Sequence, residues 1–252
     1  MQVNPYNDLK KVLGKCDARN EYIELILREF EEEKDKKNLK ELSEKHEIKL
    51  DTFDFDELKK KNINNYILTV HLCFEEYLNK INNLGKEIGK NWKNKKNEGS
   101  LLEHIKENVD FNEKMIDLFE ICEYYRMVRN VYLHNGKSKE ISLEKYREIR
   151  KKNFPEIKEE VPNDILNLSF YDFIFFTVAV KKLGKLIYFN LKYDLEKIKK
   201  NLDVTYKKFN KLKNNEKRLE SSIEMELKTC YNISNEERKE CVEYIKNKVK
   251  NG

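Results

Sequence analysis

Apolar residues recur at spacings of three and four along most of the chain, and this period predicts amphipathic helices rather than strands. The clearest example lies between residues 57 and 90. Its apolar positions are Ile63, Tyr66, Ile67, Val70, Phe74, Tyr77, Leu78 and Ile81. We expect one long helix here, ended by Gly85 and Gly89 and by the polar segment 91–100.

The same periodicity predicts helices on both sides of this segment. Residues 6–47 form one predicted helical stretch, and residues 48–56 a connector with mild strand character. Beyond the polar segment, helices are predicted over 101–107, 112–134, 142–152, 169–193 and 194–252. Two of these begin with an N-terminal capping pattern, Ser169-x-x-Asp172 and Ser234-x-x-Glu237.

Together these helices predict an all-α protein. We divide it into an N-terminal helical extension (1–56), a helical core (57–193) and polar C-terminal helices (194–252). The composition agrees, since 7 Gly and 3 Pro among 252 residues are too few for the turns of an all-β fold. Charged residues are 38% of the chain but nearly cancel, and 11% of residues are aromatic, which argues against disorder. The net charge of +5 is too small to identify a partner, although it does not oppose nucleic acid.

The cysteines, the first residues and the most apolar stretch indicate the cellular compartment of the protein. Five cysteines, an odd number without CxxC spacing, argue against a disulfide framework or zinc site and favour buried, reduced thiols. The first residues lack the apolar region of a signal peptide. The most apolar stretch, 165–180, is interrupted by Asn167, Ser169 and Asp172 and is too short and too polar to cross a bilayer. We therefore expect a soluble cytoplasmic protein that has no membrane partner.

One segment carries a pattern with chemical meaning. The predicted helix 112–134 ends in Arg129-Asn130-Val131-Tyr132-Leu133-His134, and the helix stop Asn135-Gly136 follows. Arg129 presents a permanently charged, planar fork of donors that suits phosphate. His134 titrates near neutral pH and can act as general acid or base. Cleavage of RNA through its ribose 2′-OH needs these two functions, and it requires neither a metal ion nor a cofactor.

This segment resembles the RNxxxH form of the Arg-x4-to-6-His motif in the catalytic branch of the HEPN superfamily (higher eukaryotes and prokaryotes nucleotide-binding). The resemblance covers the motif and the order of helices over residues 57–193. It implies a HEPN-like helical bundle and a metal-independent endoribonuclease that leaves a cyclic phosphate. It also implies a homodimer, in which each subunit supplies an Arg-His pair to a composite cleft on the two-fold axis.

The same resemblance implies a biological role. Members of the ribonuclease branches act in toxin-antitoxin, abortive-infection and antiphage systems, so we expect a toxin or defence effector. Its partner would be an antitoxin, a sensor or another regulatory protein. A further HEPN branch carries a Tyr two residues after the His, which a nucleotidyltransferase modifies. Here Gly136 occupies that position, and this departure argues against that form of regulation.

We assign roles to five residues in and around the motif. Arg129 would stabilise the phosphate and His134 would transfer the proton. Asn130 would position the scissile phosphate or fix the geometry of the Arg129 and His134 side chains. Arg126 and Lys137 are expected to bind RNA, because they are the basic residues that flank the motif.

Helix geometry leaves two interpretations of the motif open. Positions 129 and 134 are separated by about 140° around an ideal helix and so lie on different faces. Either the helix unwinds near His134, or Arg129 serves a site that a second chain completes. A non-catalytic HEPN-like module that binds nucleotide or RNA, or regulates a partner, is the alternative function. A plain helical scaffold is the third, since cations often cap the C-terminus of a helix.

Weaker signals allow more than one reading. Trp92, with Lys93, Lys95 and Lys96 around it, either stacks an RNA base or packs back on the domain. His71 lies in an apolar helix and should be packed, whereas His46 and His104 lie among charges and should be exposed. A short apolar stripe in the C-terminal helices would pack on the core or on a second subunit.

Overall fold

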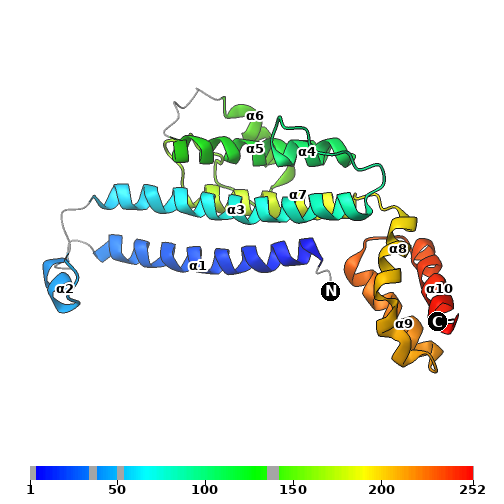
Figure 1. The fold of residues 1–252 in the computed structure, drawn as a ribbon. Helices are drawn as coiled ribbons and strands as arrows, with labels where there is room; N and C mark the ends of the chain where they lie inside the picture. The colour runs from blue at the N-terminus through cyan, green and yellow to red at the C-terminus, as the bar shows by residue number, and fades with distance from the viewer. Residues whose placement is uncertain (1–3, 34–38, 50–53, 135–141, 252) are drawn as a thin grey trace. The chain divides into compact units, whose positions relative to one another are not determined.

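The computed structural model describes residues 4–33, 39–49, 54–134 and 142–251. Within these ranges the named elements are all helical, so the predicted all-α class is confirmed (Figure 1). The helices are α1 (Pro5–Glu33), α2 (Leu39–Lys45), α3 (Phe55–Ile88), α4 (Leu101–Asn108), α5 (Glu113–His134), α6 (Glu144–Asn153), α7 (Phe170–Phe189), α8 (Leu195–Thr205), the 3-10 helix η1 (Tyr206–Leu212), α9 (Glu216–Cys230) and α10 (Asn235–Asn251). None of the helices in these ranges is long and apolar enough to span a membrane.

Several predicted boundaries agree with the structure to within a few residues. The long helix predicted over 57–90 is α3, and the predicted helix 112–134 is α5. The capping pattern Ser234-x-x-Glu237 is confirmed, because each residue's side chain accepts a hydrogen bond from the other's backbone N–H, at 2.8 and 3.2 Å. The helical stretch predicted over 6–47 contains two helices, α1 and α2, and residues 34–38 between them lie outside the described ranges.

The chain divides into two compact units, and the boundary between them falls inside α1, α3 and α7. One unit contains residues 10–74 and 113–183. The other contains residues 1–9, 75–112 and 184–252. Each unit has its own core, so the two are described separately.

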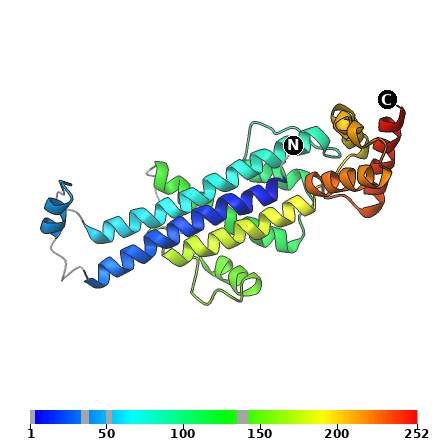
Figure 2. The ribbon, with the colours of Figure 1, turned by 90° about the horizontal axis from the view of Figure 1, so that it is seen from below.

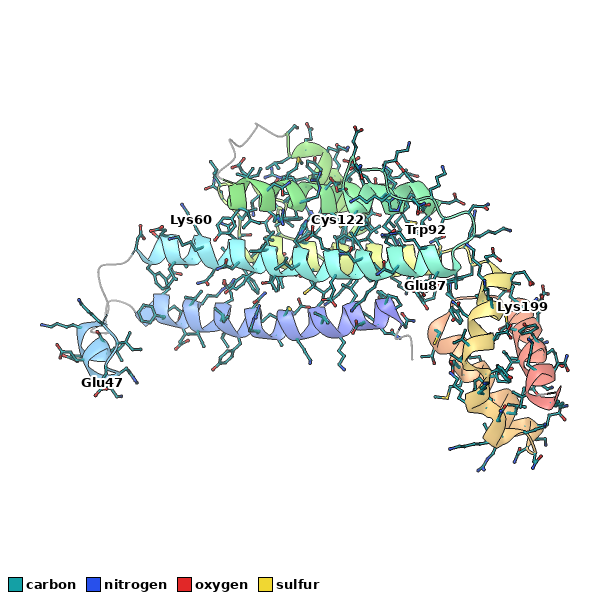
Figure 3. The ribbon with its side chains drawn as sticks, viewed as in Figure 1. Glu47, Lys60, Glu87, Trp92, Cys122 and Lys199 are labelled. Carbon is teal, nitrogen blue, oxygen red and sulfur yellow. The ribbon has the colours of Figure 1, made fainter. Side chains whose placement is uncertain are left out.

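The unit of residues 10–74 and 113–183 is built in three layers of helices. In it, α3 and α7 form the middle layer, with α5 on one side and α1 on the other (Figures 1 and 2). Cys122, labelled in Figure 3, is among the buried side chains on α5. The largest side chains buried in this core are mostly aromatic: Tyr124, Tyr125, Phe154, Phe173, Phe175 and Phe176. Tyr125 stacks on Phe176 with ring centroids 4.6 Å apart, so α5 and α7 are held by large, closely packed surfaces.

A buried carboxylate joins α5, α7 and the loop before α7. Asp172 is fully buried and accepts hydrogen bonds from the Tyr125 hydroxyl at 2.9 Å and from the Asn163 backbone and side-chain amides at 2.9 and 2.7 Å. Ser169 donates to it from its backbone N–H and from Oγ, at 2.8 and 3.0 Å. The predicted cap is therefore confirmed in one half: Asp172 bonds back to Ser169, but the Ser169 hydroxyl donates to the carboxylate instead of accepting from the helix.

The unit of residues 1–9, 75–112 and 184–252 contains the C-terminal helices. We predicted polar helices here, with a short apolar stripe that packs on the core or on a second subunit. In the structure α8, η1, α9 and α10 pack on one another around an apolar centre. Its buried members include Ile198, Leu202, Phe209, Leu219, Ile223, Leu227, Val242, Ile245 and Val249. This cluster also contacts the end of α3, since Lys197 Nζ donates to the Gly89 carbonyl oxygen at 3.0 Å.

Trp92 packs back on the same unit. An added Cβ on Gly85 would lie 2.3 Å from atoms of the Trp92 ring, so the indole rests on the glycine's backbone. Trp92 Nε1 donates to Asn82 Oδ1 at 3.3 Å. The sequence allowed the Trp92 ring either to stack an RNA base or to pack back on the domain. These contacts favour packing on the domain for Trp92 and the loop 91–97.

Gly85→Ala should destabilise the protein by about 1–3 kcal/mol, because the new methyl group forces the Trp92 ring off α3. Urea unfolding followed by fluorescence measures this directly, since Trp92 is the single tryptophan of the chain. Gly14→Ala is the matched control. Position 14 also lies within a helix but has no atom within 4 Å of an added Cβ, so this change should stabilise by about 0.5–1 kcal/mol. Equal effects of the two substitutions would contradict the packing of Trp92 on Gly85.

Candidate functional site

The predicted motif lies on the last two turns of α5. This helix is α-helical from Glu113 to His134, so Arg129 and His134 belong to one uninterrupted segment. The helix ends at His134 and residues 135–141 lie outside the described ranges, so the first interpretation, in which the helix unwinds near His134, stays a prediction. Positions 129 and 134 are about 140° apart around the helix axis, which favours a site that a second chain completes. The side chain of His134 and the whole of Lys137 lie outside what the structure describes.

Arg129 is half-buried and forms no ion pair with a described residue. Its Nη1 donates to Asn130 Oδ1 at 2.9 Å, and Asn130 is neutral. Its Nε is buried and has no hydrogen-bond partner among the described residues. Within those residues no carboxylate pairs with Arg129. A guanidinium without a carboxylate partner retains its charge for an oxyanion, which is the property a phosphate site needs.

Arg126, one turn earlier, is in a different state. Its Nε donates to Glu123 Oε2 at 2.7 Å, and its Nη2 lies 2.6 Å from the same oxygen. A phosphate would have to displace this carboxylate before Arg126 could bind RNA. Of the two arginines, Arg129 is thus the one whose surroundings suit phosphate binding.

Tyr132 was part of the motif but received no role from the sequence. It follows Arg129 by three residues, and side chains at this spacing are neighbours on a helix surface. Its side chain is exposed, and its hydroxyl lies 3.5 Å from Asn65 Oδ1 on α3, a long hydrogen bond. Lys61 lies one turn before Asn65 and is paired with Glu57 at 2.7 Å. An aromatic ring therefore lies next to Arg129 on the surface of α5, and the signal for Tyr132 was present in the i, i+3 spacing.

Two buried tyrosines, about one turn before Arg129, fix the helix that carries the motif. Tyr125 donates to the buried carboxylate of Asp172, and the Tyr124 hydroxyl donates to the backbone oxygen of Asn163. Burial raises the pKa of both phenols well above the usual value of 10, so they stay protonated and remain donors. The hydrogen bonds of Tyr124 and Tyr125 consequently fix the orientation of α5 about its own axis, and with it the positions of the motif residues.

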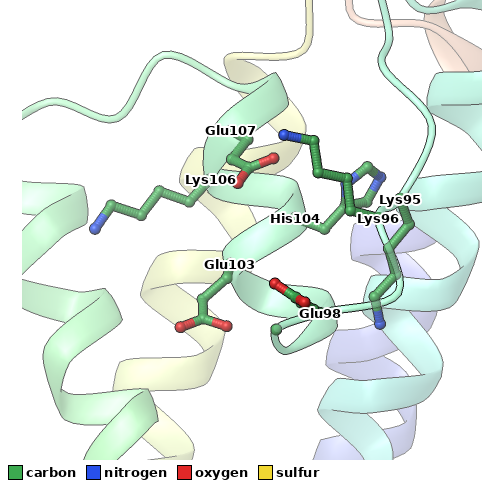
Figure 4. Close-up of a pocket in the computed structure, with 8 residues that line it drawn as sticks. Lys95, Lys96, Glu98, Glu103, His104, Lys106 and Glu107 are labelled. Carbon is green, nitrogen blue, oxygen red and sulfur yellow. The ribbon is translucent and has the colours of Figure 1, made fainter.

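A cavity of about 640 Å³ lies at α4, in the other unit (Figure 4). Three lysines and three glutamates line it: Lys95, Lys96, Lys106, Glu98, Glu103 and Glu107. Figure 4 shows carboxylate and ammonium groups interleaved around the cavity. Because their charges cancel, the cavity does not favour a polyanion, and we do not place the RNA site there.

His104, in the wall of this cavity, was predicted to be exposed, and this prediction was wrong. The residue is buried, with Nε2 3.2 Å from Asn82 Oδ1 and Nδ1 3.4 Å from Asn108 Nδ2. Its ring meets Trp92 edge to face, with centroids 6.0 Å apart. Burial lowers the pKa of His104 and favours the neutral imidazole. The predictions for His71, which is buried, and His46, which is exposed, are confirmed.

In the described ranges, His, Cys, Asp and Glu form no group of three or more that could hold a metal ion. Comparisons of the chain with protein-family models, curated proteins and solved structures found no match. The residues of α5 and their surroundings are therefore the features from which a function can be inferred.

Proposed function

We propose that this chain is a HEPN-type endoribonuclease that cleaves RNA without a metal ion, through Arg129 and His134. The observation that carries the proposal is the state of Arg129. Its guanidinium lies five residues before His134 on one uninterrupted helix, bonded to a neutral amide and to no described carboxylate. The layered arrangement of α1, α3, α5 and α7 supports a HEPN-like bundle.

The proposed reaction is attack of the ribose 2′-OH on the adjacent phosphate. The 2′-oxygen forms a bond to phosphorus while the bond from phosphorus to the 5′-oxygen breaks, which gives a cyclic phosphate and a 5′-hydroxyl. His134 accepts the 2′ proton, and a second histidine returns a proton to the leaving oxygen. Arg129 binds the non-bridging oxygens, where charge develops. Asn130 holds the guanidinium plane through its bond to Nη1.

The second histidine and the geometry of the motif both call for a homodimer. Positions 129 and 134 lie on different faces of an ideal helix, so we expect that the pair from one chain does not converge on one phosphate. A two-fold axis beside the end of α5 brings the motifs of both chains into one cleft.

We further propose that the enzyme acts as a toxin or antiphage-defence effector, restrained by an antitoxin, sensor or regulatory partner.

Tyr132 supplies a place for an RNA base next to Arg129. Tyr132→Ala should weaken binding of single-stranded RNA by about 1–3 kcal/mol, since a stacked base is worth that much. Tyr132→Phe should bind as the wild type does, because the ring is kept and the long bond to Asn65 contributes little. Binding is measured by fluorescence anisotropy of labelled RNA, with His134→Ala added to each protein so that the RNA is not cleaved. An equal loss of RNA affinity in Tyr132→Ala and Tyr132→Phe would contradict stacking of a base on the ring.

Mixing the wild type with an inactive variant tests the composite site. Wild type and His134→Ala, refolded together in equal amounts, should show about a quarter of the activity of the same total amount of wild type, because only dimers that hold two histidines cleave. A mixture with about half of that activity would place the site within one chain. A wild type that binds RNA but does not cleave it would favour the non-catalytic module.

A further inference from the structure

The outer face of α1 carries a continuous apolar stripe. Tyr22, Leu25 and Ile26 are 65%, 63% and 48% exposed, and their spacing of three and four places them on one face of the helix. Ala18, one turn earlier, is also exposed, and Gly14 has no atom within 4 Å of an added Cβ. Single exposed apolar side chains are ordinary on proteins, but a contiguous stripe of them marks an interaction surface.

This stripe lies apart from the proposed catalytic motif. Within the unit of residues 10–74 and 113–183, α1 packs on the α3 and α7 layer through buried positions such as Leu13 and Asn20. The motif is on α5, on the opposite side of that layer (Figures 1 and 2). A partner on the stripe would therefore not contact the motif of the same chain.

Charges of opposite sign mark the two ends of the stripe. Lys11 and Lys15 lie toward its N-terminal end, and Glu29 and Glu32 toward its C-terminal end, all exposed. None of the four forms an ion pair with another described residue, whereas the neighbouring Arg28 is paired with Glu24 at 2.9 Å. A partner that fits this face has the opposite order of charges along its length.

We infer that the occupant is a second copy of this chain, with α1 packed antiparallel against α1 around a two-fold axis near Tyr22. In this register Lys15 faces the partner's Glu29, and the small Ala18 faces the partner's Ile26. Because the axis is two-fold, every contact occurs twice. The lysines of each copy therefore pair with the glutamates of the other. A parallel pair would instead bring lysines against lysines and glutamates against glutamates, which costs free energy.

The size of the stripe sets the strength of the contact. From Lys11 to Glu32 it extends roughly 30 Å along the helix, at about 1.5 Å per residue. A single pair of helices of this length gives an interface at the low end of the stable range. The pairing should accordingly depend on protein concentration over about 1–100 µM. It does not rest on the proposed function, because the stripe and the motif lie on different helices.

Sedimentation equilibrium of the full chain over this concentration range tests the inference. Leu25→Glu should halve the mass of the assembly without loss of helix in circular dichroism, since position 25 is exposed. Lys15→Glu and Glu29→Lys should each weaken association by about 5- to 10-fold, and the double exchange should restore it. Val204→Glu is the control, because Val204 is 80% exposed on α8 and should leave the mass unchanged.

Three results would overturn the inference. A wild type that stays monomeric at about 100 µM would leave the stripe without this occupant. A Leu25→Glu protein with the wild-type mass would place self-association elsewhere. A double exchange no better than either single exchange would contradict the antiparallel register. Cleavage assays play no part in these readings, so a failed interface and a failed ribonuclease remain distinguishable.

Discussion

RNA cleavage by His134→Ala is expected to fall by about 100- to 10,000-fold, the usual contribution of a general acid or base. Arg129→Ala should lose about 100- to 1,000-fold, because the charge that develops on the phosphate is no longer compensated. Arg129→Lys should recover only part of this loss, since lysine keeps the charge but lacks the planar fork that Asn130 orients. Values of kcat/KM on a labelled RNA near pH 7 measure all three effects.

Arg126→Ala is the matched control for the loss of an arginine from the same helix. Because Arg126 is already neutralised by Glu123, its removal should change kcat/KM by less than about 5-fold. Thermal unfolding of each variant checks that the fold persists. A result in which Arg126→Ala is as damaging as Arg129→Ala, or in which His134→Ala cleaves normally, would contradict the assignment.

Asp172→Ala should lower the free energy of unfolding by about 3–5 kcal/mol, the largest stability effect that we expect from any single substitution discussed here. The change leaves the buried Tyr125 hydroxyl and the half-buried backbone amide of Asn163 without their acceptor, and the Asn163 side-chain amide keeps only Ser169 Oγ. Each unsatisfied buried donor carries a desolvation penalty. The substitution also removes the group that fixes the rotation of α5.

Urea denaturation provides the measurement, and Asp164→Ala provides the control. Asp164 lies in the same loop, is exposed, and accepts one hydrogen bond, from the Leu166 backbone at 2.9 Å. Its replacement should cost less than about 1 kcal/mol. Asp172→Asn should fall between the two, since it keeps the shape and one acceptor oxygen. An Asp172→Ala protein within about 1 kcal/mol of wild type would show that the loop holds without this carboxylate.

Local signals explain most of what the sequence predicted correctly. The three- and four-residue period of α3 and α5 is set within each helix, so it is readable without knowledge of the fold. The same is true of the Ser234 and Glu237 cap, whose partners are three residues apart. The pairing of Arg126 with Glu123 is also local and was open to prediction from its i, i+3 spacing.

The errors arose where distant segments decide the outcome. His104 is surrounded by charges in the sequence, yet its burial depends on Asn82 and Trp92, which belong to other elements. The apolar positions of the C-terminal helices are sparse in each helix, and they form a core only when the four elements combine. Asp172 was predicted as a cap, but its bonds to Tyr125 and Asn163 are tertiary contacts.

The central claim is that Arg129 and His134 cleave RNA without a metal ion, and the chemistry of the product ends tests it most directly. Purified protein is incubated with a defined RNA in EDTA, and the products are separated and their ends identified. The account predicts 2′,3′-cyclic phosphates and 5′-hydroxyls from the wild type, and neither product from Arg129→Ala or His134→Ala. Cleavage that stops in EDTA and returns with Mg²⁺, or products with 3′-hydroxyl and 5′-phosphate ends, would contradict it.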